Sequence, residues 1–451
     1  MFEIYKKNQK KKKKKDNHYN NPLHIECSRE NTKLSRIRYL FENKCNINGK
    51  DKTRNTPIHI LSFNKKSTKE MMEFLFLNKA ELNVGNIGNS IPLHGVCQHN
   101  STDIELIKFL IENKSQINAL NTSNNESPLH LVLSNNKISL QVVRYLVDNN
   151  AQLNTQSLSG YSLLHTLLSN KELDLGVLIY LIEKKIDLNT KNKSGSTPLH
   201  VACSNEESRF ETIKLLVEKK ADLNSKNNFE ETPLHLISSN SQMDFKIVNF
   251  LVHQKADLNS LTKKKATPIH LALSNRGCNM EVVRCLIDNK AVLNSFDDIN
   301  QTPLHKASSN SFLDYNTFRL LLLGNFFFSL FVFNFPKKKK KGKADLNLQD
   351  FCGDTALHNY LINENCSLDI VKLFVENGAH LNIPNNFQQI PLHRSIGNIG
   401  SHETIDYLLN QKSDLNFLES KPNSMDHNKE LNQYILYYIN SRENSYQNHQ
   451  I

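Results

Sequence analysis

The sequence predicts an all-α repeat solenoid, in which helix-turn-helix units are joined by short β-hairpin or turn connections. Two observations support this fold class: one His recurs at nearly constant spacing, and the residues around it recur in the same order. The spacing is 35 residues, with one step of 36 and one of 53. The recurring residues are His24, His59, His94, His130, His165, His200, His235, His270, His305, His358 and His393. A chain with a fixed internal period folds as stacked copies of one unit, so about eleven units are expected over residues 19–416.

The first helix of each unit is predicted to begin at a Pro that lies two residues before the recurring His. In Thr197-Pro198-Leu199-His200 the Thr is a suitable N-cap, and Pro lacks only an N–H that the first helical turn leaves unbonded. A polar stretch then separates this helix from a second apolar pattern with helical spacing. A Leu lies sixteen residues after the His in every unit but one, which has Phe374: Leu40, Leu75, Leu110, Leu146, Leu181, Leu216, Leu251, Leu286, Leu321 and Leu409.

Each second helix is followed by a short motif and a polar connection. The motif is Ala221-Asp222-Leu223-Asn224 in one unit, and its Asn recurs twenty-four residues after the His. The segment that follows is rich in Asn, Lys, Ser and Asp, which suits an exposed turn or hairpin leading to the next N-cap. A unit of this kind cannot bury its apolar face alone, so neighbouring units must supply the core.

The Thr-Pro-Leu-His and Ala-Asp-Leu-Asn elements closely resemble the ankyrin repeat, and the resemblance extends over residues 19–416. It implies L-shaped units, each made of a helix pair and a hairpin, that stack side by side. It also implies that the motif His hydrogen-bonds locally and braces neighbouring hairpins, so the motif histidines are not expected to bind metal. Partners of such proteins usually lie against the hairpin tips and the first-helix face.

The sequence departs from the family pattern in three ways. Its period exceeds the usual 33 residues by two, and the extra residues fall in Asn- and Ser-rich loops between the helices, which we expect to be mobile. A Gly that ends the second helix is kept only at Gly378; a Lys or Asn replaces it, with a cost of roughly 1 kcal/mol for a Lys at positive φ. Ile91 and Ile390 replace the capping Thr, which predicts weak points in the third and eleventh units. The replaced glycines are at Lys79, Asn150, Lys220, Lys255 and Lys290.

The positive charge of the chain is concentrated in two lysine runs. The formal charge is +11, and Lys10 to Lys15 with Lys337 to Lys341 account for all of it. The repeats are therefore neutral overall, which argues against a nucleic-acid-binding face. Residues 1–18 are expected to be a Lys-rich disordered segment without a secretory signal, because no apolar run follows its charges.

Basic residues nevertheless gather in several predicted hairpins, and these are the candidate partner-binding residues. They would suit an acidic segment on a partner protein. The alternative, that they are ordinary solvated turn lysines, stays open. The candidates are Lys50, Lys52, Arg54, Lys191, Lys193, Lys226, Lys263, Lys264 and Lys265.

One unit contains eighteen extra residues, 325–342, directly after its second helix. Removing them restores the 35-residue register. Three interpretations compete: a membrane anchor over residues 320–335, a protruding functional loop, or a retained intron. We favour the intron because of what could encode this segment in the gene. Gly-Asn can be encoded by a sequence that contains a GT splice donor, Phe runs by poly-T, and Lys runs by poly-A. Sixteen residues span about 24 Å as a helix, short of a hydrocarbon core of about 30 Å.

No motif for catalysis or for cofactor binding occurs in the chain. The eight cysteines form no CxxC pair, and Cys27, Cys97 and Cys203 share one repeat position that is typical of a small buried side chain. We therefore expect reduced thiols, an intracellular and more specifically cytoplasmic protein, and no metal or cofactor. Residues 417–451 carry Leu431, Ile435 and Ile439 at helical spacing, which predicts a C-terminal capping helix followed by a polar tail.

Together these features predict a non-enzymatic scaffold that binds other proteins. Two alternatives from other classes are a membrane-tethered protein anchored by residues 320–335 and a nucleic-acid-associated protein that uses its lysine runs. Neither a membrane nor a nucleic acid is the expected partner.

Overall fold

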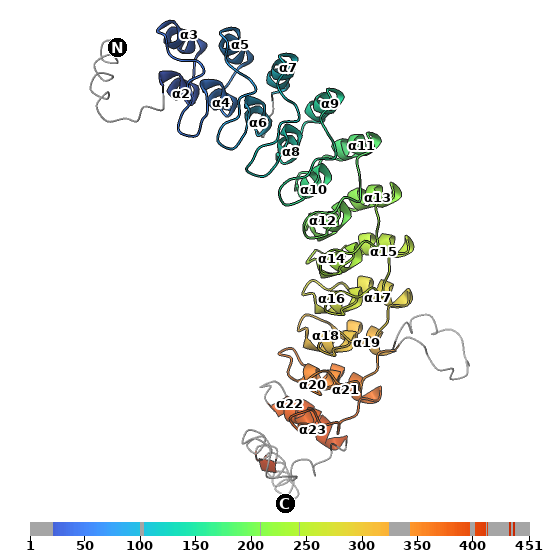
Figure 1. Ribbon diagram of the computed structural model, residues 1–451. Coiled ribbons are helices and arrows are strands. Elements are labelled where there is room, and N and C mark those ends of the chain that lie inside the picture. The colour runs from blue at the N-terminus through green and yellow to red at the C-terminus, as the bar shows by residue number, and fades with distance from the viewer. Residues whose placement is uncertain are drawn as a thin grey trace, which may run out of the picture. The chain divides into compact units, whose positions relative to one another are not determined.

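The predicted all-α repeat architecture is confirmed by a computed structural model. The model describes residues 21–99, 103–207, 209–242, 244–323, 343–396, 402–411 and 413, together with Gln433, Leu436 and Tyr437. The chain divides into two compact units, residues 1–202 and 203–451, in which helices alternate between two rows (Figure 1). Residues 1–18 and nearly all of 417–451 lie outside the described residues, so the predicted tail and capping helix stay predictions.

The first helix of each repeat begins where the motif places it, at Pro in nine of the eleven repeats and at Leu163 or Ala356 in the others. The residue before it has extended backbone, as at Thr232 with φ −94° and ψ 165°, which suits an N-cap. These helices are α2 (Pro22–Cys27), α4 (Pro57–Ser62), α6 (Pro92–Cys97), α8 (Pro128–Leu133), α10 (Leu163–Leu168), α12 (Pro198–Ser204), α14 (Pro233–Ser239), α16 (Pro268–Ser274), α18 (Pro303–Ser309), α20 (Ala356–Leu361) and α22 (Pro391–Ile396).

The second helices bury the periodic Leu: Leu75, Leu146 and Leu251 have no exposed surface. The two terminal repeats differ, because Leu40 and Leu409 are only half-buried while Ile37 and Leu408 are fully covered. The second helices are α3 (Leu34–Glu42), α5 (Lys69–Leu77), α7 (Ile104–Glu112), α9 (Leu140–Asp148), α11 (Leu175–Glu183), α13 (Phe210–Glu218), α15 (Phe245–His253), α17 (Met280–Asp288), α19 (Tyr315–Leu323), α21 (Leu368–Glu376) and α23 (His402–Asn410).

Nine of the second helices end in a left-handed residue at the position where the family pattern has Gly, and the corresponding positions after α19 and α23 lie outside the described residues. Lys220 has a φ of 71° and Lys255 one of 68°. The Lys220 N–H donates to the carbonyl of Val217 at 2.9 Å, and the next N–H, of Ala221, donates to Leu216 at 2.9 Å. These bonds satisfy carbonyls that the end of the helix leaves free. Lysines therefore occupy strained backbone, as the sequence predicts, and the same holds at Lys44, Lys114 and Lys185.

The connections between repeats are tight turns, since the described residues contain no β-strand and only two isolated bridges. In a representative turn the Asn227 side-chain oxygen accepts the N–H groups of Phe229 at 2.9 Å and Glu231 at 3.0 Å. Glu230 adopts a φ of 60° to close the turn. The β-hairpin part of the expected connections is thus reduced to hydrogen-bonded turns, which we call hairpin tips.

The motif His ties most repeats to the next; Nε2 of His130 is an exception and has no hydrogen-bond partner. The backbone N–H of Thr232 donates to Nδ1 of His235 at 3.1 Å, which leaves the proton of the ring on Nε2. Nε2 then donates to the carbonyl of Ala266, 31 residues further along, at 3.2 Å. Where Ile91 replaces the Thr, its N–H still reaches His94 Nδ1 at 3.1 Å, so only the hydroxyl contact is missing.

The loops between the helices, which the sequence predicts to be mobile, are held by a row of Asn side chains. The Asn275 side-chain amide donates to the carbonyl of Asn240 at 2.6 Å, and the Asn310 amide donates to Asn275 at 3.0 Å and to Leu273 at 2.8 Å. The same contacts recur at Asn64, Asn135, Asn170, Asn240 and, to one carbonyl, Asn363. We call this set the loop Asn row. The loop Asn row gives a structural role to the loops between the helices, which contain the two residues by which the period exceeds 33.

The repeat interrupted by residues 325–342 makes the contacts of an uninterrupted one. Asn294 Oδ1 accepts the N–H of Asp345 at 2.8 Å, just as Asn259 accepts that of Val292 at 2.8 Å. Leu320, Leu321 and Leu322 are buried in the repeat as part of α19. The start of the proposed anchor 320–335 is therefore core, and the rest lies outside the described residues. Among those that are described, no helix is both long and apolar enough to span a bilayer.

Candidate functional site

All nine basic candidate residues are exposed on hairpin tips, and they fall in both units. The tips before α4 and α12 carry those of residues 1–202, and the tips before α14 and α16 carry those of residues 203–451. The structure brings Lys226 close to the tip that bears Lys263, Lys264 and Lys265, because its Nζ donates to the carbonyl of Leu261 at 3.1 Å. Lys226 also pairs with Glu230 at 3.7 Å, so part of its charge is used within the chain.

The hairpin tips of residues 203–451 are joined by one backbone hydrogen bond at each step. The N–H of Lys263 donates to the carbonyl of Phe229 at 2.9 Å, and the N–H of Asp298 donates to Lys264 at 2.8 Å. The N–H of Phe351 donates to Ile299 at 3.0 Å, and the N–H of Asn386 donates to Cys352 at 2.9 Å. Five successive tips thus form one continuous edge.

Large apolar side chains on this edge were not recognised from the sequence. Phe229 is 61% exposed, Ile299 47%, Phe351 72% and Phe387 50%, and each lies six or seven residues before a motif His. We call these four residues the apolar tip row. An apolar residue in a segment that is otherwise polar and exposed was the signal that could have revealed them.

The charge along the same edge is mixed. Lys263, Lys264 and Lys265 project from the tip that lies between those of Phe229 and Ile299, and Glu230 and Asp298 are exposed on the tips on either side. The edge therefore presents a local basic cluster between acidic groups. Such a pattern complements particular side chains better than it complements a uniformly charged polyanion.

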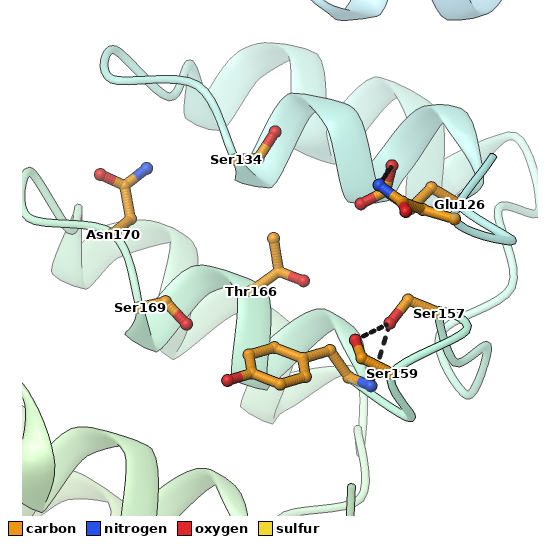
Figure 2. Close-up of a pocket in the computed structure, with 9 residues that line it drawn as sticks. Glu126, Ser134, Ser157, Ser159, Thr166, Ser169 and Asn170 are labelled. Atoms are coloured by element: carbon orange, nitrogen blue, oxygen red, sulfur yellow. Dashed lines mark hydrogen bonds between the residues drawn. The ribbon is translucent and has the colours of Figure 1, made fainter. Parts of the chain in front are cut away.

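A hollow of about 300 Å³ lies between two neighbouring repeats of residues 1–202, where their hairpin tips, helix α10 and the C-terminal ends of α8 and α10 line it (Figure 2). Ser157 and Ser159 share a hydrogen bond of 2.9 Å within its lining, and Glu126 is the one charged residue there. Hydroxyl and amide groups make up most of the rest. The lining residues are Asn124, Glu126, Ser134, Ser157, Ser159, Tyr161, Thr166, Ser169 and Asn170.

The motif histidines and the periodic cysteines have the environment of structural residues. Burial lowers the pKa of His130 and of His235 to about 4, so both rings are neutral near pH 7. Burial raises the pKa of Cys27 and of Cys203 to about 12, which keeps these thiols protonated and poorly nucleophilic. Over the residues that the structure describes, no three His, Cys, Asp or Glu side chains gather as metal ligands.

A family model described as ankyrin repeats, in three copies, matches the chain in six overlapping stretches. They are residues 62–157, 93–192, 140–227, 164–262, 234–329 and 324–418. A search of curated proteins finds no match to the chain. The matched stretches cover most of the sequence, and the helix pairs, the hairpin tips and the bracing His of the structure are what this family implies. The chain therefore belongs to the ankyrin repeat family.

Proposed function

We propose that the chain is a non-enzymatic scaffold and that the hairpin edge of residues 203–451 binds protein segments with both acidic and apolar side chains. Ankyrin repeats are generally protein–protein interaction modules, which supports the general role. The observation that carries the specific proposal is the apolar tip row with a lysine cluster beside it.

The physical argument rests on the energy of apolar surface. Soluble monomers rarely expose contiguous large apolar side chains, and such patches mark binding surfaces. Full burial of an exposed Phe side chain contributes about 1.5–3 kcal/mol. Phe229, Phe351 and Phe387 are 61%, 72% and 50% exposed, so each offers a large part of that free energy to a partner. Aromatic anchors of this kind are common at the centre of protein interfaces. The three lysines at 263–265 would then select acidic residues and set the register of the bound segment.

The mixed charge of the edge favours a protein partner over a nucleic acid or an anionic membrane. Glu230 and Asp298 would be brought against phosphate groups if a polyanion covered the tips, and this repulsion would oppose binding. A protein segment can instead place a basic or neutral residue opposite each carboxylate.

The test is affinity purification of the full chain from the cell that makes it, with three variants compared. One variant carries Phe229→Ser, Phe351→Ser and Phe387→Ser, and a second carries Ser at 263–265. A matched control carries Lys50→Ser and Lys52→Ser on a tip of residues 1–202. We expect the first two variants to lose the same proteins and the control to keep them.

Purified partners then allow a quantitative measurement. Binding through the lysine cluster should weaken as salt rises, and this salt dependence should diminish in the variant with Ser at 263–265. Retention of all partners by both tip variants would contradict the proposal.

A further inference from the structure

A carboxylate in residues 1–202 lacks the cation that its equivalent has in residues 203–451. Asp354 lies four residues before a motif His, and its Oδ2 accepts Nη2 of Arg394 at 2.9 Å. Arg394 directly follows the next motif His, His393. The Asp354 side chain is 7% exposed and the Arg394 side chain 25%, so this is a largely covered ion pair.

A second repeat uses the same position for a cation. Lys306 directly follows His305, and its Nζ lies 2.7 Å from Oδ2 of Asp297 on the adjoining tip. The residue after the motif His is therefore the place from which a cationic side chain reaches the hairpin carboxylates.

Glu126 stands at the position of Asp354, four residues before His130. The residue at the position of Arg394 is Thr166, and both pairs are separated by 40 residues. Thr166 carries no charge, and its one side-chain hydrogen bond goes to the carbonyl of Ser162 rather than to Glu126. Glu126 makes no ion pair with any described residue, and the one side-chain hydrogen bond to its carboxylate is a long contact from Asn124 Nδ2 at 3.4 Å.

The space that a longer side chain would occupy is the hollow of about 300 Å³ (Figure 2). Its volume is at the lower end of the range for ligand sites, which suits one inserted side chain better than a larger molecule. Glu126 faces Ser157 and Thr166 across the hollow. The Thr166 hydroxyl donates to the carbonyl of Ser162 at 3.4 Å, so its oxygen is left as an acceptor toward the hollow.

We propose that this hollow binds the guanidinium group of an arginine side chain presented by a partner protein, with Glu126 as its counter-ion. The inference rests on the proposed protein-binding function, but it concerns a separate site that recognises the opposite charge. A guanidinium has five N–H donors in a planar fork, which matches one carboxylate together with the hydroxyl oxygens of Ser157, Ser159 and Thr166. A lysine would match the charge, but its three donors sit on a single nitrogen and lack the planar fork of a guanidinium.

The direct test uses N-acetyl-L-arginine amide as the probe, so that it does not depend on finding the partner. The full chain is labelled at its Thr methyl groups, and the Thr166 resonance is followed by NMR during titration into the millimolar range. N-acetyl-L-citrulline amide, which is nearly isosteric but uncharged, is the control ligand. We expect a saturable shift of the Thr166 resonance with the arginine probe, no shift with citrulline, and binding at least tenfold weaker in Glu126→Gln.

An equal response to both ligands, or an unchanged response in Glu126→Gln, would overturn the proposal. An equal response to N-acetyl-L-lysine amide would overturn its guanidinium specificity. Binding of the probe with no protein captured in the purification experiment would uphold this site while the proposed scaffold role failed. Capture of partners without binding of the probe would uphold the scaffold role and overturn the arginine site.

A second test fills the hollow from within the chain. Thr166→Arg should place a guanidinium beside Glu126, in the position that the Arg394 guanidinium takes beside Asp354. It should raise the urea midpoint of unfolding relative to Thr166→Gln and abolish binding of the probe. The gain should vanish when Glu126→Gln is added. Val201→Arg is the matched control, because it changes the same position of the next repeat, where Tyr161 stands at the place of the carboxylate. A gain of the same size in Val201→Arg, or one that survives Glu126→Gln, would count against the pairing.

Discussion

Mild acid should destabilise the array, because its motif histidines are buried in the neutral form. Burial lowers the pKa of His130 and of His235 from 6.5 to about 4 in the folded protein. The unfolded chain keeps the ordinary value and therefore binds more protons over this interval. The free energy of unfolding consequently falls as the pH is lowered from about 6.5 to about 4.

The size of the effect follows from the two pKa values. At pH 5 each of these rings contributes a loss of about 2 kcal/mol relative to pH 8, or about 4 kcal/mol for the pair. The pKa values of His59, His94, His165, His270, His305 and His358 are also lowered, with burial as the largest cause, so they act in the same direction. A loss of about 4 kcal/mol is a large fraction of the stability of a typical domain, which is about 5–15 kcal/mol.

Urea denaturation followed by circular dichroism at pH 8 and pH 5 measures the loss. His235→Gln provides the internal comparison: it should be less stable than the wild type at pH 8, because the link from Thr232 to Ala266 is broken. Its further loss between pH 8 and pH 5 should be smaller by about 2 kcal/mol, since one titrating ring is gone. Equal stability of the wild type at the two pH values, or an equal pH dependence in the variant, would refute the reasoning.

Three further predictions concern stability and chemistry. Asn275→Ala removes a side chain of the loop Asn row and leaves two carbonyls without their donor, so urea denaturation should show a loss of about 1–3 kcal/mol. Lys220→Gly and Lys255→Gly relieve left-handed backbone, and each should raise the stability by up to about 1 kcal/mol in the same assay, whereas a loss would mean that the lysine side chains contribute more than the strain costs. Deletion of residues 325–342 should leave the unfolding midpoint unchanged or higher, and if the segment is a retained intron, sequenced transcripts should lack 54 nucleotides there; a lower midpoint, or transcripts that keep them, would argue for a genuine insertion.

The repeat register could be predicted from the sequence because several independent positions repeat together. The Pro that starts a helix, the motif His and the Leu sixteen residues later recur together in most copies, so the break in their spacing is enough to locate the eighteen extra residues. The left-handed lysines were found by alignment alone. Ile91 was expected to weaken its repeat, and the structure limits that loss to one hydroxyl contact, because the backbone N–H still reaches His94.

Other features were missed because their residue types have an ordinary explanation. An Asn in a loop is typical of a turn, so the recurrence of Asn135, Asn170 and Asn240 five residues after the motif His was not interpreted as a row of hydrogen bonds. Phe351 and Phe387 were not singled out from the sequence, because lysines are the more evident candidates for partner contact in the hairpin segments. Whether Glu126 has a cation beside it depends on which side chains meet across repeats, and the order of residues along the chain does not determine that.

The side-chain links between repeats also bear on how a gene of this kind can change. The bracing His, the motif Asn and the loop Asn row each reach a partner in the adjacent repeat at nearly the same residue separation. Thirty-five codons correspond to 105 nucleotides (3 × 35), and losing or duplicating one such block would leave every link with an equivalent partner at the new junction. Unequal recombination between copies can therefore lengthen or shorten the array without a compensating substitution, while the hairpin tips remain free to diverge.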